Sequence, residues 1–309
     1  MKSPTNLNYE VRPCKFVERR MLLSAFMRII PRFNVNYQYI GFGGLAFTDF
    51  KLFHRELHIN TMYSIEGGYN EQKLEFNKPY SCIKILCGDS SNMLSSIDLS
   101  KSSIIWLDYD GCLTMDVFRD LEQVLMKIPH GSIYLMSCNR QLRKEKIPYS
   151  LADLSALFGN LVPLGLENDC CCNTKAPTTI KKMLEADCAN VISDRNKTET
   201  SKLKFQTLFN LVYEEYRGAR MYTFGGIVLH ETFDEKTLNI WDLDFINTDE
   251  PYEVDIPNLT YREASALNQI LNLNERESYF VDNSIIEKDE IERYKKYYKY
   301  LPNFYDVRI

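Results

Sequence analysis

The sequence predicts an α/β fold in which a mostly parallel sheet carries helices on both faces and is closed by an antiparallel hairpin, with further helices at the carboxyl end. Two observations lead to this prediction. Between residues 36 and 140, short apolar runs alternate with helical patterns. These runs are nearly continuous in apolar residues, which is typical of strands buried on both faces of a parallel sheet.

The elements follow in order from the amino terminus. An amphipathic helix is expected within residues 8–33, where Val17, Met21, Leu22 and Phe26 recur at helical spacing. Five strands and their connecting helices come next. Strands are expected near 37–41, 61–66, 82–89, 103–109 and 131–139, and helices near 47–59, 69–78 and 114–128.

The regular alternation ends after Asn139. Residues 140–200 are expected to form an inserted lid region, and an amphipathic helix is expected at 204–216. The apolar runs 220–233 and 237–245 are expected to pair through a short turn as the hairpin that closes the sheet.

The chain is expected to have three parts. These are an amino-terminal helix region (1–35), an α/β domain (36–250) and a helical appendage (251–309). In the appendage, Thr260 and Glu263 have the spacing of a capping box, which predicts a helix start. The tyrosine-rich segment at the end could stack on bases, or pack the last helix onto the domain or onto a second subunit; its tyrosines are Tyr294, Tyr297, Tyr298 and Tyr300.

Composition disfavours several classes of protein. A net charge of −5 and a pI near 5.6 provide no overall basic field for nucleic acid or anionic membrane. No apolar stretch reaches the roughly 20 residues of a membrane span, so no membrane contact is expected. The nine cysteines follow no disulfide spacing and are expected to be reduced thiols in a cytoplasmic protein.

A glycine loop and an acidic residue suggest a nucleotide cofactor. Gly41, Gly43 and Ala46 match the pattern GxGxxG/A between the first strand and its helix, where backbone and helix terminus can approach a ligand. Glu66 follows twenty residues later at the end of the second strand, from which a carboxylate can bind both ribose hydroxyls. The simpler alternative is that Glu66 is a solvated strand end.

A third acid points to the kind of cofactor. Asp89 ends the third strand and can reach the amine of adenine, with Ser90 beside it, or it can simply cap a turn. Here the chain resembles the class I (Rossmann-like) S-adenosylmethionine-dependent methyltransferases. YIGFGG, YSIEGG, CGDSS and WLDYDG resemble their first four motifs, and a hairpin at 221–245 is similar to their reversed last strand.

This resemblance implies roles for particular residues. Gly41 and Gly43 would line the methionine and ribose part of S-adenosylmethionine, Glu66 would bind the ribose, and Asp89 with Ser90 the adenine. Asp108 would lie where cofactor and substrate meet. The chain departs from the family at Tyr39-Ile40-Gly41, where an acid often precedes the glycine, so Asp49 becomes a candidate partner for the cofactor's amino group.

The fourth motif bears on the chemistry. It lacks the Asp-Pro-Pro-Tyr type of sequence with which methyltransferases hold the amino group of a base, which disfavours amino methylation of DNA. An oxygen acceptor is expected, because a hydroxyl nucleophile benefits from a base or a metal such as Mg²⁺, and Asp108 with Asp110 could supply either. Asp108 and Asp110 are the candidate catalytic residues, because a carboxylate can remove the proton of a hydroxyl nucleophile. No metal site is predicted: alternate residues of a strand are hard to bring to one Mg²⁺ ion, and His54 and His58 have no evident third ligand.

Two alternatives remain open. DYDGCLT also resembles the first motif of haloacid-dehalogenase-like phosphatases, in which Asp108 would attack phosphorus beside Mg²⁺, with Ser137 and Lys181 or Lys182 completing the site. That family has this motif on its first core strand, whereas three strand ends precede it here, so methyl transfer is favoured. The missing acid before Gly41 would suit a binding module that has lost catalysis.

Basic residues provide the little evidence on substrates. They gather near the start of the chain and just after the fifth strand, where an acceptor would enter, so a small or nucleotide-like substrate is considered, while nucleic acid is disfavoured by the acidic total. The residues concerned are Arg12, Lys15, Arg19, Arg20, Arg140, Arg143, Lys144 and Lys146.

Overall fold

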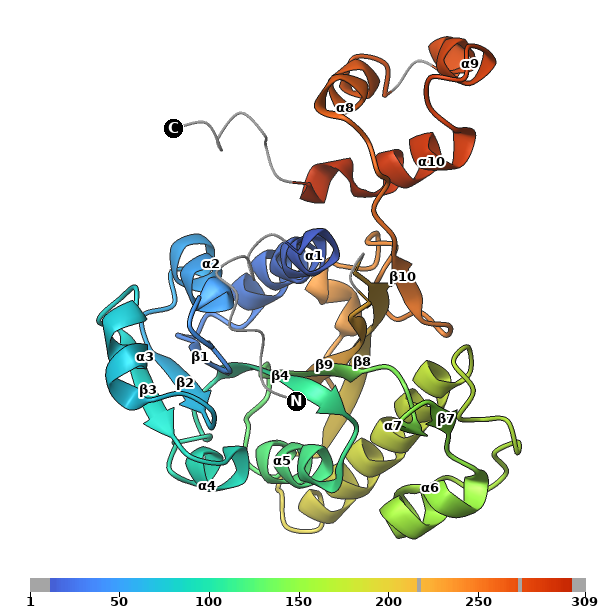
Figure 1. The fold of residues 1–309 in the computed structure, drawn as a ribbon. Coiled ribbons are helices and arrows are strands. Elements are labelled where there is room, and N and C mark those ends of the chain that lie inside the picture. The colour runs from blue at the N-terminus through green and yellow to red at the C-terminus, as the bar shows by residue number, and fades with distance from the viewer. Residues whose placement is uncertain (1–11, 216–217, 272–273, 302–309) are drawn as a thin grey trace.

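An eight-stranded sheet forms the centre of the molecule in a computed structural model, which describes residues 12–215, 218–271 and 274–301 (Figure 1). The strand order is β10-β8-β9-β5-β4-β1-β2-β3. The strands are β1 (Gln38–Gly41), β2 (Met62–Glu66), β3 (Ile83–Cys87), β4 (Ser103–Cys112), β5 (Ile133–Asn139), β8 (Leu203–Glu214), β9 (Arg220–His230) and β10 (Tyr252–Val254).

The directions of the strands confirm the predicted fold class. All neighbours in the sheet are parallel except β9, which runs antiparallel to both β5 and β8. The chain builds outward from β1 to β3 and then crosses back to β4 on the other side of β1. In a sheet of this kind, ligands bind beyond the carboxyl ends of the strands at such a switch point, which here lies between β1 and β4.

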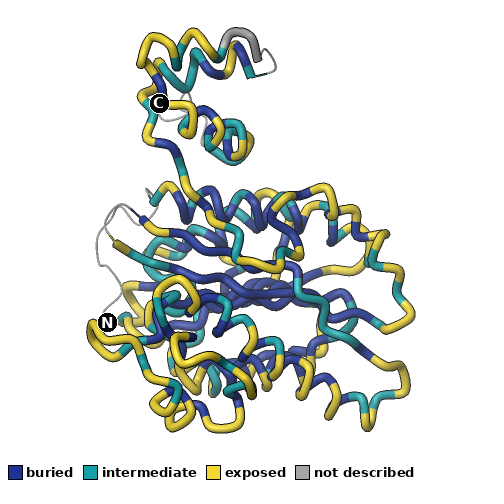
Figure 2. The backbone as a smooth tube through the Cα atoms, turned by 90° about the vertical axis from the view of Figure 1, so that its right-hand side faces the viewer, coloured by how far each residue is buried: buried dark blue, intermediate teal, exposed yellow. Residues whose placement is uncertain are grey.

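Helices cover both faces of the sheet. One face packs against α1 (Pro13–Ile29), α2 (Thr48–Leu57) and α3 (Glu71–Asn77), and the other against α4 (Ser90–Ser95), α5 (Met115–Leu125) and α7 (Ala176–Arg195). Strand β4 shows how two cores arise, because Ile104 and Trp106 join the first cluster while Ile105 and Leu107 join the second. Figure 2 shows the strands as a buried layer between more exposed helices.

The predicted strands up to residue 139 and the amphipathic helix are confirmed in the described residues, but the hairpin has other members. Residues 204–216 do not form a helix: β8 runs from Leu203 to Glu214 and pairs with β9. Residues 237–245 do not form a strand and contain instead the end of a 3₁₀ turn, Glu235–Leu238. The helical spacing was misleading because β8 is buried on both faces from Leu208 to Tyr213 and so lacks an alternating pattern.

The region expected as a lid contains small elements and one long helix. β6 (Arg143–Lys144) and β7 (Ile147–Pro148) form a separate two-stranded ribbon, followed by α6 (Leu151–Phe158). Helix α7 belongs to the body of the domain, because it packs against α5 and β8.

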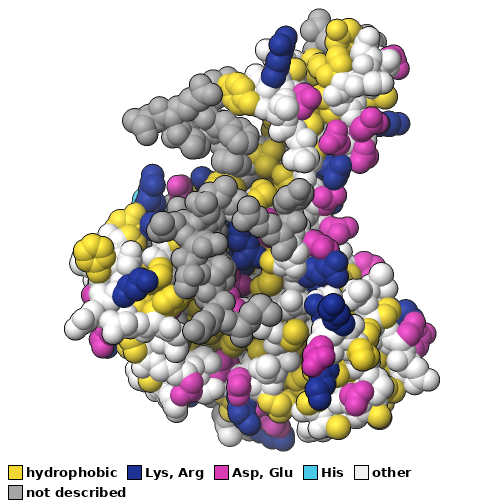
Figure 3. Space-filling model, in the orientation of Figure 1, with side chains coloured by type: hydrophobic (Ala, Val, Ile, Leu, Met, Phe, Trp, Pro, Cys, Tyr) yellow, Lys and Arg dark blue, Asp and Glu magenta, His cyan; other side chains and the backbone are white. Residues whose placement is uncertain are grey.

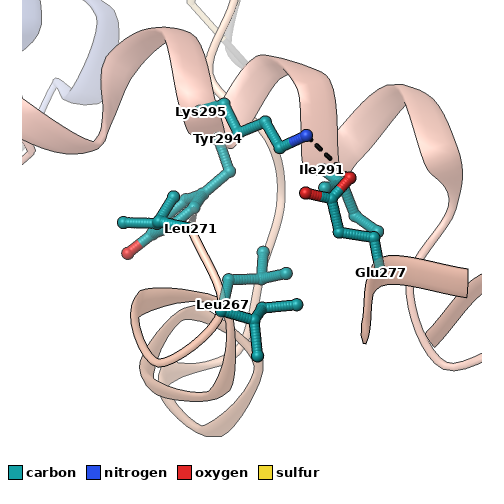
Figure 4. A pocket seen from close by; sticks show the side chains of 7 residues that line it. Leu267, Leu271, Glu277, Ile291, Tyr294 and Lys295 are labelled. Atoms are coloured by element: carbon teal, nitrogen blue, oxygen red, sulfur yellow. Dashed lines mark hydrogen bonds and ion pairs between the residues drawn. The ribbon is translucent and has the colours of Figure 1, made fainter. Parts of the chain in front are cut away.

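The carboxyl-terminal segment begins with a strand, since β10 pairs with β8. After it come α8 (Tyr261–Asn268), α9 (Asn274–Asp282) and α10 (Lys288–Tyr297), and α8 starts at the predicted capping box. Figure 4 shows how these helices meet: Leu267 and Ile291 pack together, and Lys295 binds Glu277 with 2.7 Å between Nζ and Oε2.

The tyrosines of the last helix pack within the chain. The hydroxyl of Tyr294 donates to Asn268, and the ring of Tyr297 packs across Tyr252 from β10. These contacts hold α10 against α8 and against the edge of the sheet. Within the described residues, no helix is long and apolar enough to cross a membrane.

Candidate functional site

The glycine loop lies at the switch point of the sheet. Gly41 ends β1 and is in register with Ser64 of β2 and Trp106 of β4. A Cβ atom at Gly41 would lie 2.7 Å from the hydroxyl of Tyr39 and 2.9 Å from the carbonyl oxygen of Trp106, so only glycine fits there. The loop continues to Gly44, whose φ of +55° favours glycine.

Glu66 is bound to this loop. One carboxylate oxygen, Oε1, accepts hydrogen bonds from the Gly44 backbone N–H at 2.8 Å and from the Ser64 hydroxyl at 2.6 Å. The Ser64 hydroxyl itself accepts from the Gly43 N–H at 3.1 Å. Glu66 is buried, and this burial raises the pKa of its carboxyl group. The alternative of a solvated strand end is therefore wrong. Both of these hydrogen bonds of Glu66 use Oε1.

Asp89 lies on the neighbouring strand end but is oriented by its own helix. β2 and β3 are in register at Glu66 and Cys87, and Asp89 follows two residues later. Its carboxylate is exposed and caps α4 by accepting from the Asn92 backbone N–H at 3.1 Å, a hydrogen bond that lowers the pKa of Asp89. The structure thus brings Glu66 and Asp89 to adjacent strand ends, each fixed by its own loop.

A buried aspartate that sequence reasoning missed organises the loops beside Asp89. Asp120 of α5 is fully buried and accepts hydrogen bonds from the hydroxyls of Ser90, Ser91 and Tyr109. The hydroxyl of Ser90 is therefore committed to Asp120. One signal was present in the sequence: Asp120 is three residues after Val117 and one before Leu121, on the apolar face of its helix.

Asp108 forms a buried ion pair that the sequence did not indicate. Its Oδ2 lies 3.0 Å from Nζ of Lys15, which also lies 2.9 Å from Oε2 of Glu18. Lys15 and Glu18 are fully buried, and the side chain of Asp108 is 10% exposed. The other oxygen of Asp108, Oδ1, is buried and has no hydrogen-bond partner among the described residues.

A chain of hydroxyl groups connects this ion pair to the sheet. Thr223 of β9 donates to Oε1 of Glu18 and lies 2.6 Å from the Ser137 hydroxyl, which accepts from the Trp106 indole at 2.9 Å. Nζ of Lys15 lies 4.3 Å from the centroid of the Trp106 ring. Lys15, one of the basic residues near the start of the chain, is thus buried and paired with carboxylates.

Asp49, the candidate partner for the cofactor's amino group, is bound by a basic residue of α1. Arg19 forms an ion pair with Asp49, and both side chains are buried. In this structure the Asp49 carboxylate thus joins α1 to α2. On the surface, Arg140 pairs with Glu214 at 3.1 Å, and Figure 3 shows acidic and basic side chains interspersed over the described part of one face. This mixture of charges forms no large basic patch on that face, in agreement with the net charge of −5.

Asp110 is exposed beside the glycine loop. The register between β4 and β5 shifts after Asp108, which pairs with Ser137, so that Cys112 is the next residue to pair. The intervening residues bulge from the strand. The charge of Asp110 contributes to the raised pKa of Glu66, after the larger effect of burial, which means that the two carboxylates lie near each other.

The residues described give no support for a metal centre. No group of three or more His, Cys, Asp or Glu side chains in residues 12–215, 218–271 and 274–301 could hold an ion. Nδ1 of His54 contacts the carbonyl oxygen of Ile59 at 2.9 Å, within its own turn. Cys170 and Cys171 are buried, with 3.7 Å between their sulfur atoms.

The side chains that the phosphatase alternative needs are engaged in other contacts, although Ser137 is the register partner of Asp108. Ser137 is buried and bonded to Trp106 and Thr223. Lys181 donates to the carbonyl oxygens of Thr248 and Asp249. These interactions commit both side chains to the fold, and the DYDG segment lies on the fourth strand in chain order, not the first.

Comparison with solved structures matches part of this chain to several methyltransferases. Human N-acetylserotonin methyltransferase in complex with SAM matches 68% of this chain and 51% of its own, at 11% identity and a TM-score of 0.35. An O-methyltransferase family protein from Burkholderia thailandensis matches 70% and 55%, at 10% identity and a TM-score of 0.35. TomG, an O-methyltransferase from Streptomyces achromogenes, matches 68% and 79%, at 8% identity and a TM-score of 0.37.

This chain spans about half the length of the first two of these proteins. A search of curated protein sequences finds no match. In contrast, a family model described as "Putative O-methyltransferase" matches residues 7–309, nearly the whole sequence. The chain therefore belongs to this O-methyltransferase family, within the class I S-adenosylmethionine-dependent methyltransferases.

Proposed function

We propose that the protein binds S-adenosylmethionine over the Gly41–Gly44 loop and transfers its methyl group to an oxygen acceptor. The observation that carries this proposal is the contact of buried Glu66 with the Gly44 N–H at the switch point of the sheet. It leaves Oε2 of Glu66 as an acceptor for ribose hydroxyls. The family match supports the choice of cofactor and of oxygen as the acceptor atom.

The remaining cofactor contacts follow from the strand ends. Gly41 and Gly43 allow close approach of the cofactor to the backbone. Asp89, an exposed carboxylate at the end of β3, is the proposed acceptor for the amine of adenine. Ser90 borders the same position, and Asp120 fixes its hydroxyl.

Methyl transfer to a hydroxyl group requires that the acceptor be aligned with the methyl group and that its proton be removed. When bound, S-adenosylmethionine supplies a methyl group on a cationic sulfur, which a well-aligned nucleophile can displace in line. In such a transfer the acceptor oxygen would bond to the methyl carbon, and the electrons of the carbon–sulfur bond would remain on sulfur. We assign the proton of the acceptor hydroxyl to Asp110, because its carboxylate is exposed at the end of β4.

Substitution of Asp110 tests this function. Formation of S-adenosylhomocysteine is measured with a panel of hydroxyl and amine acceptors. We expect turnover with hydroxyl acceptors, about 10²-fold slower in Asp110→Asn, with an affinity for S-adenosylmethionine within twofold of the native value. Asp116→Asn is the matched control, because Asp116 is an exposed carboxylate that pairs with Arg119 on α5. Turnover restricted to amines, or binding without turnover on any acceptor, would contradict the proposal.

A further inference from the structure

Lys15 is a fully buried ammonium group at the ligand end of the sheet. Lysines are almost never fully buried unless they are paired, and Lys15 has two carboxylate partners, Asp108 and Glu18, within 3.0 Å. Burial alone would lower the pKa of Lys15, but Asp108 and Glu18 together raise it well above its usual value. The side chain therefore remains a cation in the folded protein.

Three buried atoms of the cluster of Lys15, Glu18 and Asp108 make no hydrogen bond to the described residues. Nζ of Lys15 and Oε2 of Glu18 form an ion pair with each other, which leaves Oδ1 of Asp108. Glu18 accepts from Thr223 and contacts Lys15, and Oδ2 of Asp108 contacts Lys15. Oδ1 of Asp108 is buried and has no hydrogen-bond partner among the described residues. Since two carboxyl groups share a single ammonium, a further cation is the group that best complements Oδ1.

This oxygen lies next to the glycine loop. Gly41 pairs in register with Trp106, two residues before Asp108, at the switch point where a ligand is expected. Two other buried acids near the loop have partners of their own: Oε1 of Glu66 binds Gly44 and Ser64, and Asp49 binds Arg19. Strand β1 itself carries no acidic residue.

We propose that Oδ1 of Asp108 binds the α-ammonium group of the cofactor's methionine part, and that Lys15 is the residue that positions Asp108 for this contact. The inference rests on the proposed function, because it assumes S-adenosylmethionine as ligand. Lys15 fixes Oδ2 and turns Oδ1 toward the ligand. Without Lys15, Asp108 and Glu18 would be two carboxylates with no cation between them, and one of them would take up a proton.

Two ligands that differ in the ammonium group test this assignment. S-adenosylhomocysteine carries the amino acid part, whereas 5′-methylthioadenosine has the adenosine and thioether without it. By calorimetry, we expect Asp108→Asn to lower the affinity for S-adenosylhomocysteine at least tenfold and to leave that for methylthioadenosine within twofold. Asp187→Asn is the matched control, a buried carboxylate on the opposite face of the sheet, and should change neither affinity.

The role of Lys15 needs a variant that folds. Lys15→Met/Glu18→Gln removes the ammonium together with one of its two carboxylates, so that the cluster keeps its net charge, which Asp108 alone then carries. We expect this double variant to lose affinity for S-adenosylhomocysteine but not for methylthioadenosine. A merely structural role would lower both affinities alike, and equal loss or equal retention would overturn the positioning role.

Trp106 provides an independent readout. Its ring lies 4.3 Å from Nζ of Lys15, and the second tryptophan, Trp241, can be replaced by phenylalanine. In Trp241→Phe, S-adenosylhomocysteine should change the emission of Trp106 more than methylthioadenosine does, and Asp108→Asn should remove the difference. Equal emission changes with both ligands would overturn the assignment. If the native protein binds neither ligand, it is the proposed function that fails.

Discussion

Asp187 is a buried carboxyl group whose charged form destabilises the folded protein. Oδ2 of Asp187 is buried without a hydrogen-bond partner among the described residues, and burial, with a smaller effect of Glu122, raises its pKa to about 7. The folded protein therefore binds this proton more tightly than the unfolded chain does. Stability contributed by the protonated group is present below about pH 4 and is lost as the pH rises through 7.

Replacing Asp187 by asparagine should remove this loss of stability at high pH. We expect Asp187→Asn to be more stable than the native protein at pH 8 by about 1–2 kcal/mol, less than the full pKa shift implies because solvent screens part of the charge. At pH 4 the two proteins should be similarly stable. Thermal unfolding at both pH values measures this difference, and a variant that is less stable at pH 8 would contradict the expectation.

Single residues were predictable where they follow an apolar run. Glu66, Asp89 and Asp108 could be assigned to strand ends because the sequence changes there from apolar to acidic. Lys15 and Glu18 could not be assigned, because their importance depends on Asp108, some ninety residues away in the chain. In a helical pattern they resemble solvated charges, and only the packing of α1 on the sheet buries them.

At the scale of elements, the glycine loop connects β1 to the acid of β2. A Cβ atom at Gly43 would lie 2.6 Å from Oγ of Ser64 and 2.7 Å from the ring of Phe47. Ser64 would have to move, and its hydrogen bonds to Gly43 and Glu66 would be lost. The glycine thus holds the carboxylate in place through Ser64.

Gly43→Ala should weaken cofactor binding. We expect at least a tenfold loss of affinity for S-adenosylmethionine, about 1.4 kcal/mol or more, because the Glu66 carboxylate loses its support. The control is Gly68→Ala, since a Cβ there meets no atom within 4 Å and its φ is not in the left-handed region. Equilibrium titration of both variants makes the comparison. Equal affinities would show that Ser64 does not matter for binding.

Element prediction failed where the two faces of the sheet are equally buried. β1 to β5 were recognisable because glycine or polar turns separate them. In β8, Leu208, Phe209, Leu211 and Val212 have spacing that a helix would also produce, and the bulge between Thr207 and Phe209 interrupts any alternation. Pairing with β9 makes this segment a strand and not a helix, and pairing is not a local property of the sequence.

At the scale of the whole molecule, α1 connects distant parts of the chain to the candidate site. Its Lys15 reaches the end of β4 and its Arg19 reaches α2, while its apolar side packs on the sheet. The family match includes this helix and the C-terminal helices as well as the α/β domain. Resemblance of the motifs alone covered about a third of the chain, so the sequence led us to expect the cofactor end of the sheet but not its link to α1.

The central claim is that a single adenosine cofactor lies over the Gly41–Gly44 loop and is bound by Glu66. Calorimetric titration of the native protein and of Glu66→Gln with S-adenosylmethionine tests it most directly. We expect one molecule per chain with micromolar affinity, roughly 8 kcal/mol, and at least a tenfold loss in the variant.

The same titration has a pH dependence with a defined sign. Because burial raises the pKa of Glu66, its carboxylate takes up a proton at a higher pH than an exposed glutamate, and a protonated group accepts fewer hydrogen bonds from ribose. Affinity should therefore fall as the pH is lowered through this pKa in the native protein but not in Glu66→Gln. Absence of binding to the native protein, or equal affinity of both proteins at every pH, would contradict the account.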